Sequence, residues 1–452
     1  MGVLWILRLV AAAGSNLVAK GPGGCRRTAA PWARVGLAVF AVLLASDVAA
    51  SPRYSVVRVD EAPEIDGRLD DAVWQKAPLL GPLTQVEPVE GAAPSERTEV
   101  RLLSDGRHLY FGVRAFDREP EKIIAKEMLR DRSLTNDDRI AIVLDTYLDR
   151  RNAFFFQINP NGAIRDALID GIWSVQARRD ELGWTVEIRI PYSTLTFDPD
   201  KTAWGFNILR SVRRRNETAR WSSARLDKSF IDVSELGVLD GMSGLDAGRG
   251  IDFRPQQAVS YKRDRPDDER SVRLDPGFDL FFRATPSMKG VLTVNPDFSD
   301  APVDDRRVNL SRFGLFFPET RDFFLEDSGI FEFGDLEENG RPFFSRRVGL
   351  AVDGDAVPIR LGGRMTGRVG RVSLGLLDVQ QGRAAGVESK NLAVARARID
   401  LLERSSLGMI LTHGDPSSDE DAGLAGIDFR YRTDHARGNQ VLTWDAWVDR
   451  HA

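Results

Sequence analysis

Residues 293–333 read TVNPDFSDAPVDDRRVNLSRFGLFFPETRDFFLEDSGIFEF, and this stretch decides how the chain is interpreted. Phenylalanines recur in it, as pairs and singly, at Phe316, Phe317, Phe323, Phe324, Phe331 and Phe333. They alternate with charged residues, namely Arg312, Glu319, Arg321, Asp322 and Glu326. No common soluble-enzyme motif has this form. Because so apolar a patch would not stay exposed to water, the segment is expected to be buried.

Upstream, residues 54–238 have the pattern of short β-strands between turns. Asp105-Gly106 and Asn161-Gly162 each lie between two apolar runs, and both dipeptides favour tight hairpins. In residues 184–190, Trp184 and every second residue after it are apolar, which predicts a strand with one buried face. A strand at 205–209 is expected to continue through Arg210–Arg215 toward solvent. Many short strands at this spacing predict a β-sandwich.

Downstream, a stretch rich in Gly and Asp at 239–250 predicts a linker, after which the strands become longer. Residues 393–399, 427–432 and 442–449 alternate between apolar and polar, with Trp447 as an exception on the polar side. Strands of this kind are typical of a β-barrel in lipid, apolar outward and polar inward. A soluble antiparallel sheet whose apolar face covers a core has the same alternation. The periodicity alone leaves both interpretations open.

The Phe-rich signature resembles that of the bacterial DUF5916 family, in which a carbohydrate-binding family 9-like (CBM9-like) sandwich precedes an outer-membrane-type β-barrel. The sandwich likeness rests on Ile65-Asp66-Gly67, Trp74, Asp137-Asp138-Arg139-Ile140, Leu144-Asp145, Phe155–Gly162, Gly183-Trp184, Ile190-Pro191 and Trp204-Gly205. The resemblance spans Tyr54 to the C-terminus and implies an all-β chain. Its expected parts are a CBM9-like β-sandwich at 54–238, a linker at 239–250 and part of an antiparallel β-barrel at 251–452. Since family members continue through further barrel strands, the chain is expected to be incomplete.

Residues 1–50 are interpreted as a leader with a signal peptide. A basic region that includes Arg34 precedes the apolar run 35–44, and small residues at 48–50 predict cleavage before Ser51. The only cysteine, Cys25, lies in this leader, so the mature chain is expected to lack disulfides. The sequence therefore predicts an exported protein.

Sugar binding needs exposed aromatic rings, and Trp173 and Trp221 are the predicted stacking residues. Arg139 and Asn159, in segments that carry the likeness, are the predicted polar ligand contacts. Sugar-binding members of the resembled family carry a tryptophan before the DDxxE-type strand and a glutamate within it. Here residues 132–136 contain no tryptophan, and Ala141 stands at the glutamate position.

Asp66, Asp70 and Asp71 lie close enough in sequence to contribute oxygens to a Ca²⁺ site, with turn and cap chemistry as the alternative. The four histidines form no metal-binding pattern. Nucleophile elbows and nucleotide-binding loops are absent from the sequence as well. A net charge of −5 does not predict nucleic-acid binding.

Together these features predict a non-enzymatic envelope protein that binds a ligand or helps it pass, with a polysaccharide or glycan and outer-membrane lipid as partners. One alternative is a glycoside-hydrolase-associated enzyme that acts on O-glycosyl bonds, and another is a soluble structural β protein. The Phe-rich segment is expected to be a plug or collar between sandwich and barrel, or else ordinary core with Arg–Glu bridges at the surface. In the first case Arg312, Glu319, Arg321 and Glu326 would form an ionic network in the barrel lumen.

Overall fold

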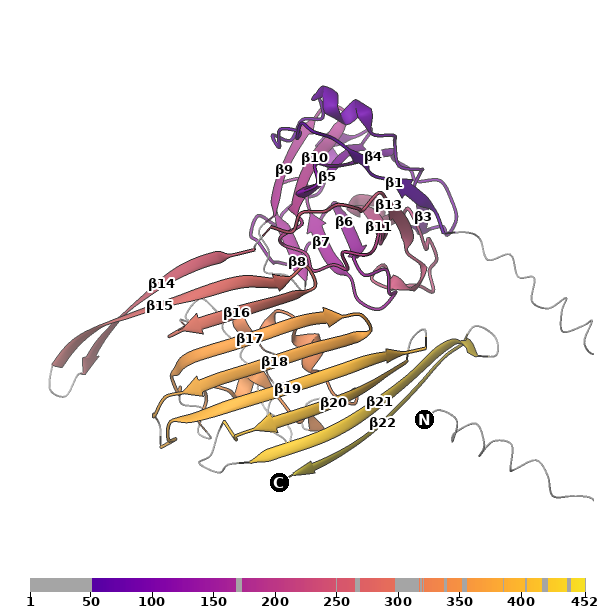
Figure 1. Cartoon of the computed structure of the whole chain (residues 1–452). Coiled ribbons are helices and arrows are strands. Elements are labelled where there is room, and N and C mark those ends of the chain that lie inside the picture. Colours follow the sequence, from indigo (N-terminus) through magenta and orange to yellow (C-terminus); the bar gives the residue numbers. More distant parts are fainter. Residues whose placement is uncertain are drawn as a thin grey trace, which may run out of the picture. The chain divides into compact units, whose positions relative to one another are not determined.

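The structure is a computed structural model. It describes residues 51–167, 173–248, 250–264, 269–296, 317, 319, 321–336, 340–351, 356–384, 386–402, 405–416, 422–436 and 440–451. β-strands are the dominant regular structure of the described chain, which confirms the predicted all-β class (Figure 1). No helix among these residues is both long and apolar enough to cross a membrane.

One eight-stranded sheet forms the first layer of the N-terminal sandwich. Its main path runs β1-β13-β11-β6-β7-β8, and β12 and β3 extend it beside β11. The bounds are β1 Arg53–Ser55, β3 Thr84–Glu87, β6 Arg139–Asp145, β7 Phe154–Ile158, β8 Ile164–Ala167, β11 Ala203–Val212, β12 Glu217–Arg220 and β13 Gly237–Asp240. The predicted turn at Asn161-Gly162 joins β7 to β8, with Gly162 at positive φ.

A five-stranded sheet of order β2-β4-β5-β10-β9 forms the second layer. The bounds are β2 Val57–Arg58, β4 Thr98–Ser104, β5 His108–Phe116, β9 Ser174–Asp180 and β10 Gly183–Pro191. The predicted Asp105-Gly106 turn joins β4 to β5. Short 3-10 turns connect strands of the sandwich: η1 Ala72–Lys76, η2 Pro120–Lys122, η3 Arg213–Arg215 and η4 Val233–Glu235.

The core of the sandwich lies between these two sheets. Trp184 and Ile188 of β10 face Phe206 of β11 and Phe156 of β7 within one buried cluster. The alternation in 184–190 therefore identified the core face of β10. Its opposite face is also buried at Thr185 and Glu187, because the Asp66–Trp74 segment packs over it.

The C-terminal region forms a nine-stranded antiparallel sheet in which every strand pairs with the next in the chain (Figure 1). The bounds are β14 Asp252–Asp264, β15 Glu269–Thr285, β16 Met288–Val294, β17 Ile359–Val369, β18 Val372–Gln381, β19 Lys390–Leu401, β20 Ser405–His413, β21 Gly423–Ala436 and β22 Gln440–His451. Between β16 and β17 lie α3 Asp322–Leu325, η5 Ser328–Phe331 and η7 Ser345–Arg347. The predicted alternating stretches fall in β19, β21 and β22.

Candidate functional site

The two predicted stacking residues are core residues. Trp173 is 5% exposed, its ring packs on Phe156 with centroids 5.1 Å apart, and its Nε1 donates to Asp166 Oδ1 at 3.2 Å. Trp221 is 8% exposed and packs on Phe206 at 5.3 Å. Gly237 lies against its ring so closely that a Cβ there would come within 2.1 Å. The expectation that both rings are exposed is wrong, because each fills the sandwich interior.

Arg139 and Asn159 lie near one another and hold a loop in place. Asn159 Nδ2 donates to Asp137 Oδ2 at 2.8 Å and to the Glu127 carbonyl at 2.9 Å. Arg139 Nη1 donates to the carbonyls of Leu134 and Thr135, and burial lowers the pKa of its guanidinium. Of the four predicted ligand residues, only these two are close together, and both contact backbone.

A polar row that sequence reasoning missed crosses the neighbouring strands. Gln157 of β7 pairs with Ala141 of β6 on one side and with Arg165 of β8 on the other. Gln157 is buried, and its Oε1 has no hydrogen-bond partner among the described groups. The sequence signal was Ala141 itself, the position where a sugar-contacting glutamate was expected. A buried carboxamide oxygen without a hydrogen-bond partner is uncommon in folded proteins.

The predicted calcium ligands do not converge. Asp66 Oδ1 accepts from the Arg68 amide at 2.8 Å, and Asp71 Oδ2 accepts from the Glu64 amide at 2.8 Å. In the part of the chain that the structure describes, no three His, Cys, Asp or Glu side chains form a group able to hold a metal ion. The structure therefore does not bring Asp66, Asp70 and Asp71 together, and Asp66 and Asp71 each bind a local backbone amide.

The carboxylate of Glu187 binds both the Ile65-Asp66-Gly67 turn and Trp74. Its carboxylate accepts from Trp74 Nε1 at 2.8 Å and from the amides of Gly67 and Asp66 at 2.8 and 3.0 Å. Burial raises the pKa of this carboxyl. The segment carrying the family likeness is thus fastened to β10 by one buried side chain.

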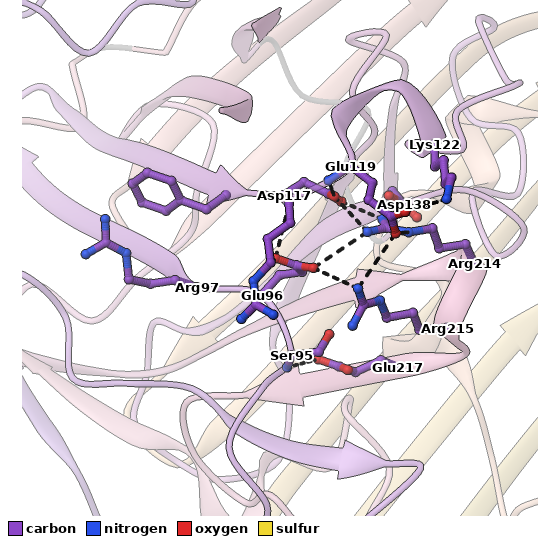
Figure 2. Close-up of polar contacts among 12 residues, drawn as sticks. Ser95, Glu96, Arg97, Asp117, Glu119, Lys122, Asp138, Arg214, Arg215 and Glu217 are labelled. Carbon is purple, nitrogen blue, oxygen red and sulfur yellow. Dashed lines mark hydrogen bonds and ion pairs between the residues drawn. The ribbon is translucent and has the colours of Figure 1, made fainter. Parts of the chain in front are cut away.

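A cluster of charged residues surrounds the buried carboxylates Glu96, Asp117 and Asp138 of the sandwich (Figure 2). Arg214 makes a two-pronged contact with Asp117 at 2.5 and 2.7 Å, and Arg215 lies 3.1 Å from Glu96. Asp138 accepts from the Arg213 amide at 2.6 Å, and burial raises the pKa of its carboxyl. The cluster joins the ends of β4, β5, β6 and β11.

This cluster corrects the prediction that Arg210–Arg215 continues a strand to solvent. β11 ends at Val212, and Arg213–Arg215 form the turn η3. Arg210 is buried and donates to the carbonyls of Arg97 and Phe116. Burial lowers the pKa of Arg210 to about 10. Arg210 and Arg214 lie against buried carboxylates, whereas Arg215 still reaches solvent, and we interpret these paired charges as structural.

The Phe-rich segment docks on one face of the nine-stranded sheet, where glycines make room for it. A Cβ at Gly362 would come within 2.9 Å of the Phe323 ring, and one at Gly426 within 2.7 Å of the Phe333 ring. Gly375 is similarly close to Ile330 Cγ2, at 2.7 Å. We call this surface the covered face. Phe323, Phe324, Phe331 and Phe333 are buried there, as expected for the segment.

Ionic contacts hold the docked segment to the covered face. Arg364 of β17 donates to the carbonyls of Phe323 and Glu326, both at 2.6 Å, and pairs with the Glu326 carboxylate. Lys289 of β16 lies 2.6 Å from Glu326 and 3.0 Å from Asp327. These groups are well satisfied, as buried charges must be.

A second ion pair spans three strands beneath the segment. Arg396 of β19 contacts Asp428 of β21 through two hydrogen bonds of 2.6 and 2.9 Å. Gly408 of β20 lies between them, and a Cβ there would come within 2.5 Å of both side chains. Asp428 also accepts from the Gly334 amide of the docked segment at 3.3 Å. The exceptional Trp447 is explained as well, because its ring lies against Gly334.

The predicted ionic network divides into separate groups. Glu319 pairs with Arg321 at 2.8 Å, whereas Glu326 pairs with Lys289 and Arg364. Arg312 lies outside the described residues. The bridges are largely buried against the covered face, not spread over the surface.

The opposite face of the sheet, which we call the open face, is apolar and exposed. Met409 is 47% and Ile427 51% exposed, whereas Arg396 and Asp428 on the covered face are 2% and 8% exposed. Other exposed apolar side chains on the open face include Leu376, Ile399, Leu407, Leu411, Trp444 and Val448. The charged face of the sheet is thus buried, and its apolar face is exposed.

Comparisons with known proteins agree with this order of parts. Residues 65–240 match the family described as carbohydrate family 9 binding domain-like, and residues 251–360 match DUF5916, a domain of unknown function. No curated protein matches the chain.

Three solved structures are similar over the N-terminal part. Two are of a family 9 carbohydrate-binding module from Caldicellulosiruptor kristjanssonii, in complex with cellotriose and with glucose. Each is 20% identical with a TM-score of 0.32, covering 42% of this chain and 92% and 94% of the module. The third is a putative carbohydrate-binding protein from Bacteroides uniformis, 14% identical with a TM-score of 0.35, covering 42% of this chain and 99% of that one. The two family matches show that the chain combines an N-terminal carbohydrate-binding family 9-like domain with a DUF5916 domain, in that order.

Proposed function

We propose that this chain is an exported envelope protein whose nine-stranded sheet inserts its open face into outer-membrane lipid, as part of a β-barrel wall. In this proposal the covered face and its docked segment line the interior, and the sandwich binds a glycan outside the membrane. The leader at 1–50 would direct export. N-terminal sequencing of the mature protein is expected to begin at Ser51.

The inverted polarity of the sheet carries the proposal. In a soluble sheet the apolar face packs on a core and the charged face meets water. Here Arg364, Arg396 and Asp428 are buried, while Leu376, Met409 and Ile427 are exposed. A large exposed apolar surface marks a face that contacts a partner or a membrane. For strands that alternate between apolar and polar side chains, the lipid of a membrane is the environment that suits the apolar face. This favours the lipid interpretation over the soluble sheet that the periodicity had left open.

The borders of the open face support the same conclusion. Tyr431 pairs with Trp444 on β21 and β22, placing two interfacial aromatics side by side. At the other end, Asp378 and His413 flank Ala393 in one row across β18, β19 and β20. Transmembrane barrels carry an outward-facing apolar band with aromatic residues at its interfaces with water, and Tyr431 and Trp444 match one such border.

Extraction tests the membrane part. The mature chain, expressed with its leader, is expected to stay with the envelope membranes after an alkaline wash and to dissolve only with detergent. A chain that remains monodisperse in plain buffer and never partitions with lipid would contradict the proposal.

A glycan ligand is supported by the family 9-like match at residues 65–240 and by the row Ala141, Gln157 and Arg165. The buried, unpaired Gln157 Oε1 would accept a sugar hydroxyl. Calorimetry with cello-oligosaccharides is expected to give binding that Gln157→Ala weakens about tenfold, the weight of one buried hydrogen bond.

Two control measurements separate the rival explanations. Trp173→Phe and Trp221→Phe keep the core filled and should leave sugar binding unchanged, whereas loss of binding in either would restore the stacking prediction. Release of shorter sugars during incubation would favour the hydrolase alternative instead.

A further inference from the structure

A concavity of about 580 Å³ interrupts the open face of the nine-stranded sheet. We propose that it binds one phospholipid whose headgroup carries a protonated amine. This inference rests on the proposed membrane function and adds a specific lipid site to it. The volume falls within the range of about 300–1,000 Å³ that is usual for small-molecule sites.

Small residues form the floor of the concavity, and large apolar ones form its walls. One row across the strands reads Leu292, Gly363, Asp378, Ala393 and His413, and the next reads Gly290, Met365, Leu376, Ala395 and Leu411. A Cβ built at Gly363 meets no atom within 4 Å, so the space above it is open. The Phe282 ring lies over Gly290 and raises one wall.

An acyl chain matches this shape and chemistry. The surroundings of the concavity are the exposed apolar side chains of the open face, so a bound chain would continue the hydrocarbon of the bilayer. A flexible chain also adapts to an irregular apolar hollow, where van der Waals packing rather than transfer from water stabilises it. A rigid or polar ligand would find few hydrogen-bond partners on Leu376, Ala395 and Leu411.

Asp378 supplies the headgroup contact. It is exposed in the row between Gly363 and Ala393, at the border of the apolar band. Its Oδ1 accepts from Asn391 Nδ2 at 2.9 Å, and no described cation lies within ion-pair distance. The neighbouring row contains Gln380 and Asn391, which marks the start of the polar zone. A carboxylate at this level complements a protonated amine, whereas it would repel an anionic headgroup.

Native mass spectrometry of the full chain tests the proposal. The protein, extracted in mild detergent, is exchanged into nanodiscs of phosphatidylethanolamine, phosphatidylcholine or phosphatidylglycerol and then released. We expect one retained phosphatidylethanolamine per chain. Asp378→Asn should lower its retention about fivefold, the effect of one charge at a membrane surface. Ala395→Phe should abolish retention by filling the concavity.

Matched variants make the result specific. Ala397→Phe lies two residues along β19 on the same face but outside the concavity, and Glu388→Gln removes an exposed carboxylate elsewhere. Both should retain the lipid as the parent chain does. Equal retention of all three lipids, or unchanged retention in Asp378→Asn and Ala395→Phe, would overturn the lipid site while leaving membrane insertion intact. A chain that needs no detergent would instead overturn the proposed function, and retention of a protein or second copy at this face would overturn the lipid assignment.

Discussion

Single buried carboxylates fasten loops to strand ends in the sandwich. Asp145, at the end of β6, accepts from the amides of Arg150 at 2.8 Å and Asp149 at 3.2 Å. Its side chain is fully buried. Burial and the neighbouring Asp149 raise the pKa of Asp145 to about 6. Ionisation of Asp145 therefore opposes folding at neutral pH.

This shift predicts how stability depends on pH. An unfolded Asp loses its proton near pH 4, whereas folded Asp145 keeps its proton up to about pH 6. Between these values the folded state binds more protons, so the free energy of unfolding falls as pH rises, by about 3 kcal/mol in total. Denaturant unfolding followed by tryptophan fluorescence, repeated from pH 4 to pH 7, measures the slope. Asp145→Asn should flatten it.

The exposed Asp200 provides the control, since Asp200→Asn should leave the slope as in the parent chain. Equal slopes for Asp145→Asn and the parent would show that another group carries the pH dependence.

The Arg396–Asp428 pair gives a second prediction at this scale. Asp428→Asn leaves the Arg396 guanidinium buried without its counter-charge, which should lower the free energy of unfolding by about 3–5 kcal/mol. The double variant Arg396→Met with Asp428→Leu removes both charges and should recover most of the loss. A thermal unfolding series of the three proteins in detergent measures this. A double variant as unstable as the single one would show that the cost is not the unpaired charge.

At the scale of elements, turn chemistry and strict alternation were readable from the sequence. Asp105-Gly106 and Asn161-Gly162 form the predicted hairpins. Residues 393–399 alternate as predicted, because Arg396 and Arg398 lie on the covered face and the apolar residues between them lie on the open face. The sequence pattern did not single out β17, β18 and β20 as alternating strands. Gly362, Gly375 and Gly408 on their covered face carry no side chain. Leu377, Val379 and Ile410 on that face are apolar because the docked segment buries them. Because glycines and apolar residues occupy the covered face of these strands, the sequence shows no alternation between apolar and polar residues there.

The glycine sites yield a matched pair of adjacent variants. Gly362→Val drives a side chain into Phe323 and Thr293, where a Cβ alone would be within 2.9 and 2.7 Å, whereas Gly363→Val points to the open face and meets nothing within 4 Å. We expect Gly362→Val to cost about 1–3 kcal/mol and to loosen the docked segment. Limited proteolysis in detergent should then cut near Arg321 in Gly362→Val alone. Equal protection of both variants would contradict the docking.

At the scale of the whole molecule, the sequence revealed two kinds of face but not which one is covered. Periodicity reports alternation, and a soluble sheet and a lipid-facing sheet alternate alike. The choice depends on the contacts of residues 321–336 with distant strands, such as Gly334 with Asp428. The predicted ligand residues failed for a related reason. Trp173 and Trp221 look like loop aromatics in sequence, but long-range packing on Phe156 and Phe206 buries them.

A charge placed on the open face provides the final prediction. Met409 and His413 are both exposed on this face of β20, Met409 within the apolar band and His413 at its border. An arginine at the bilayer midplane costs about 2–4 kcal/mol, falling to about 0–1 kcal/mol near the interface. Met409→Arg should therefore lower the fraction of chain that folds into lipid vesicles by at least tenfold, whereas His413→Arg should leave it within about fivefold. Gel-shift folding assays in vesicles, at matched protein and lipid concentrations, measure both. If Met409→Arg inserts as well as His413→Arg, the open face does not meet hydrocarbon, and its apolar side chains must be covered by protein instead.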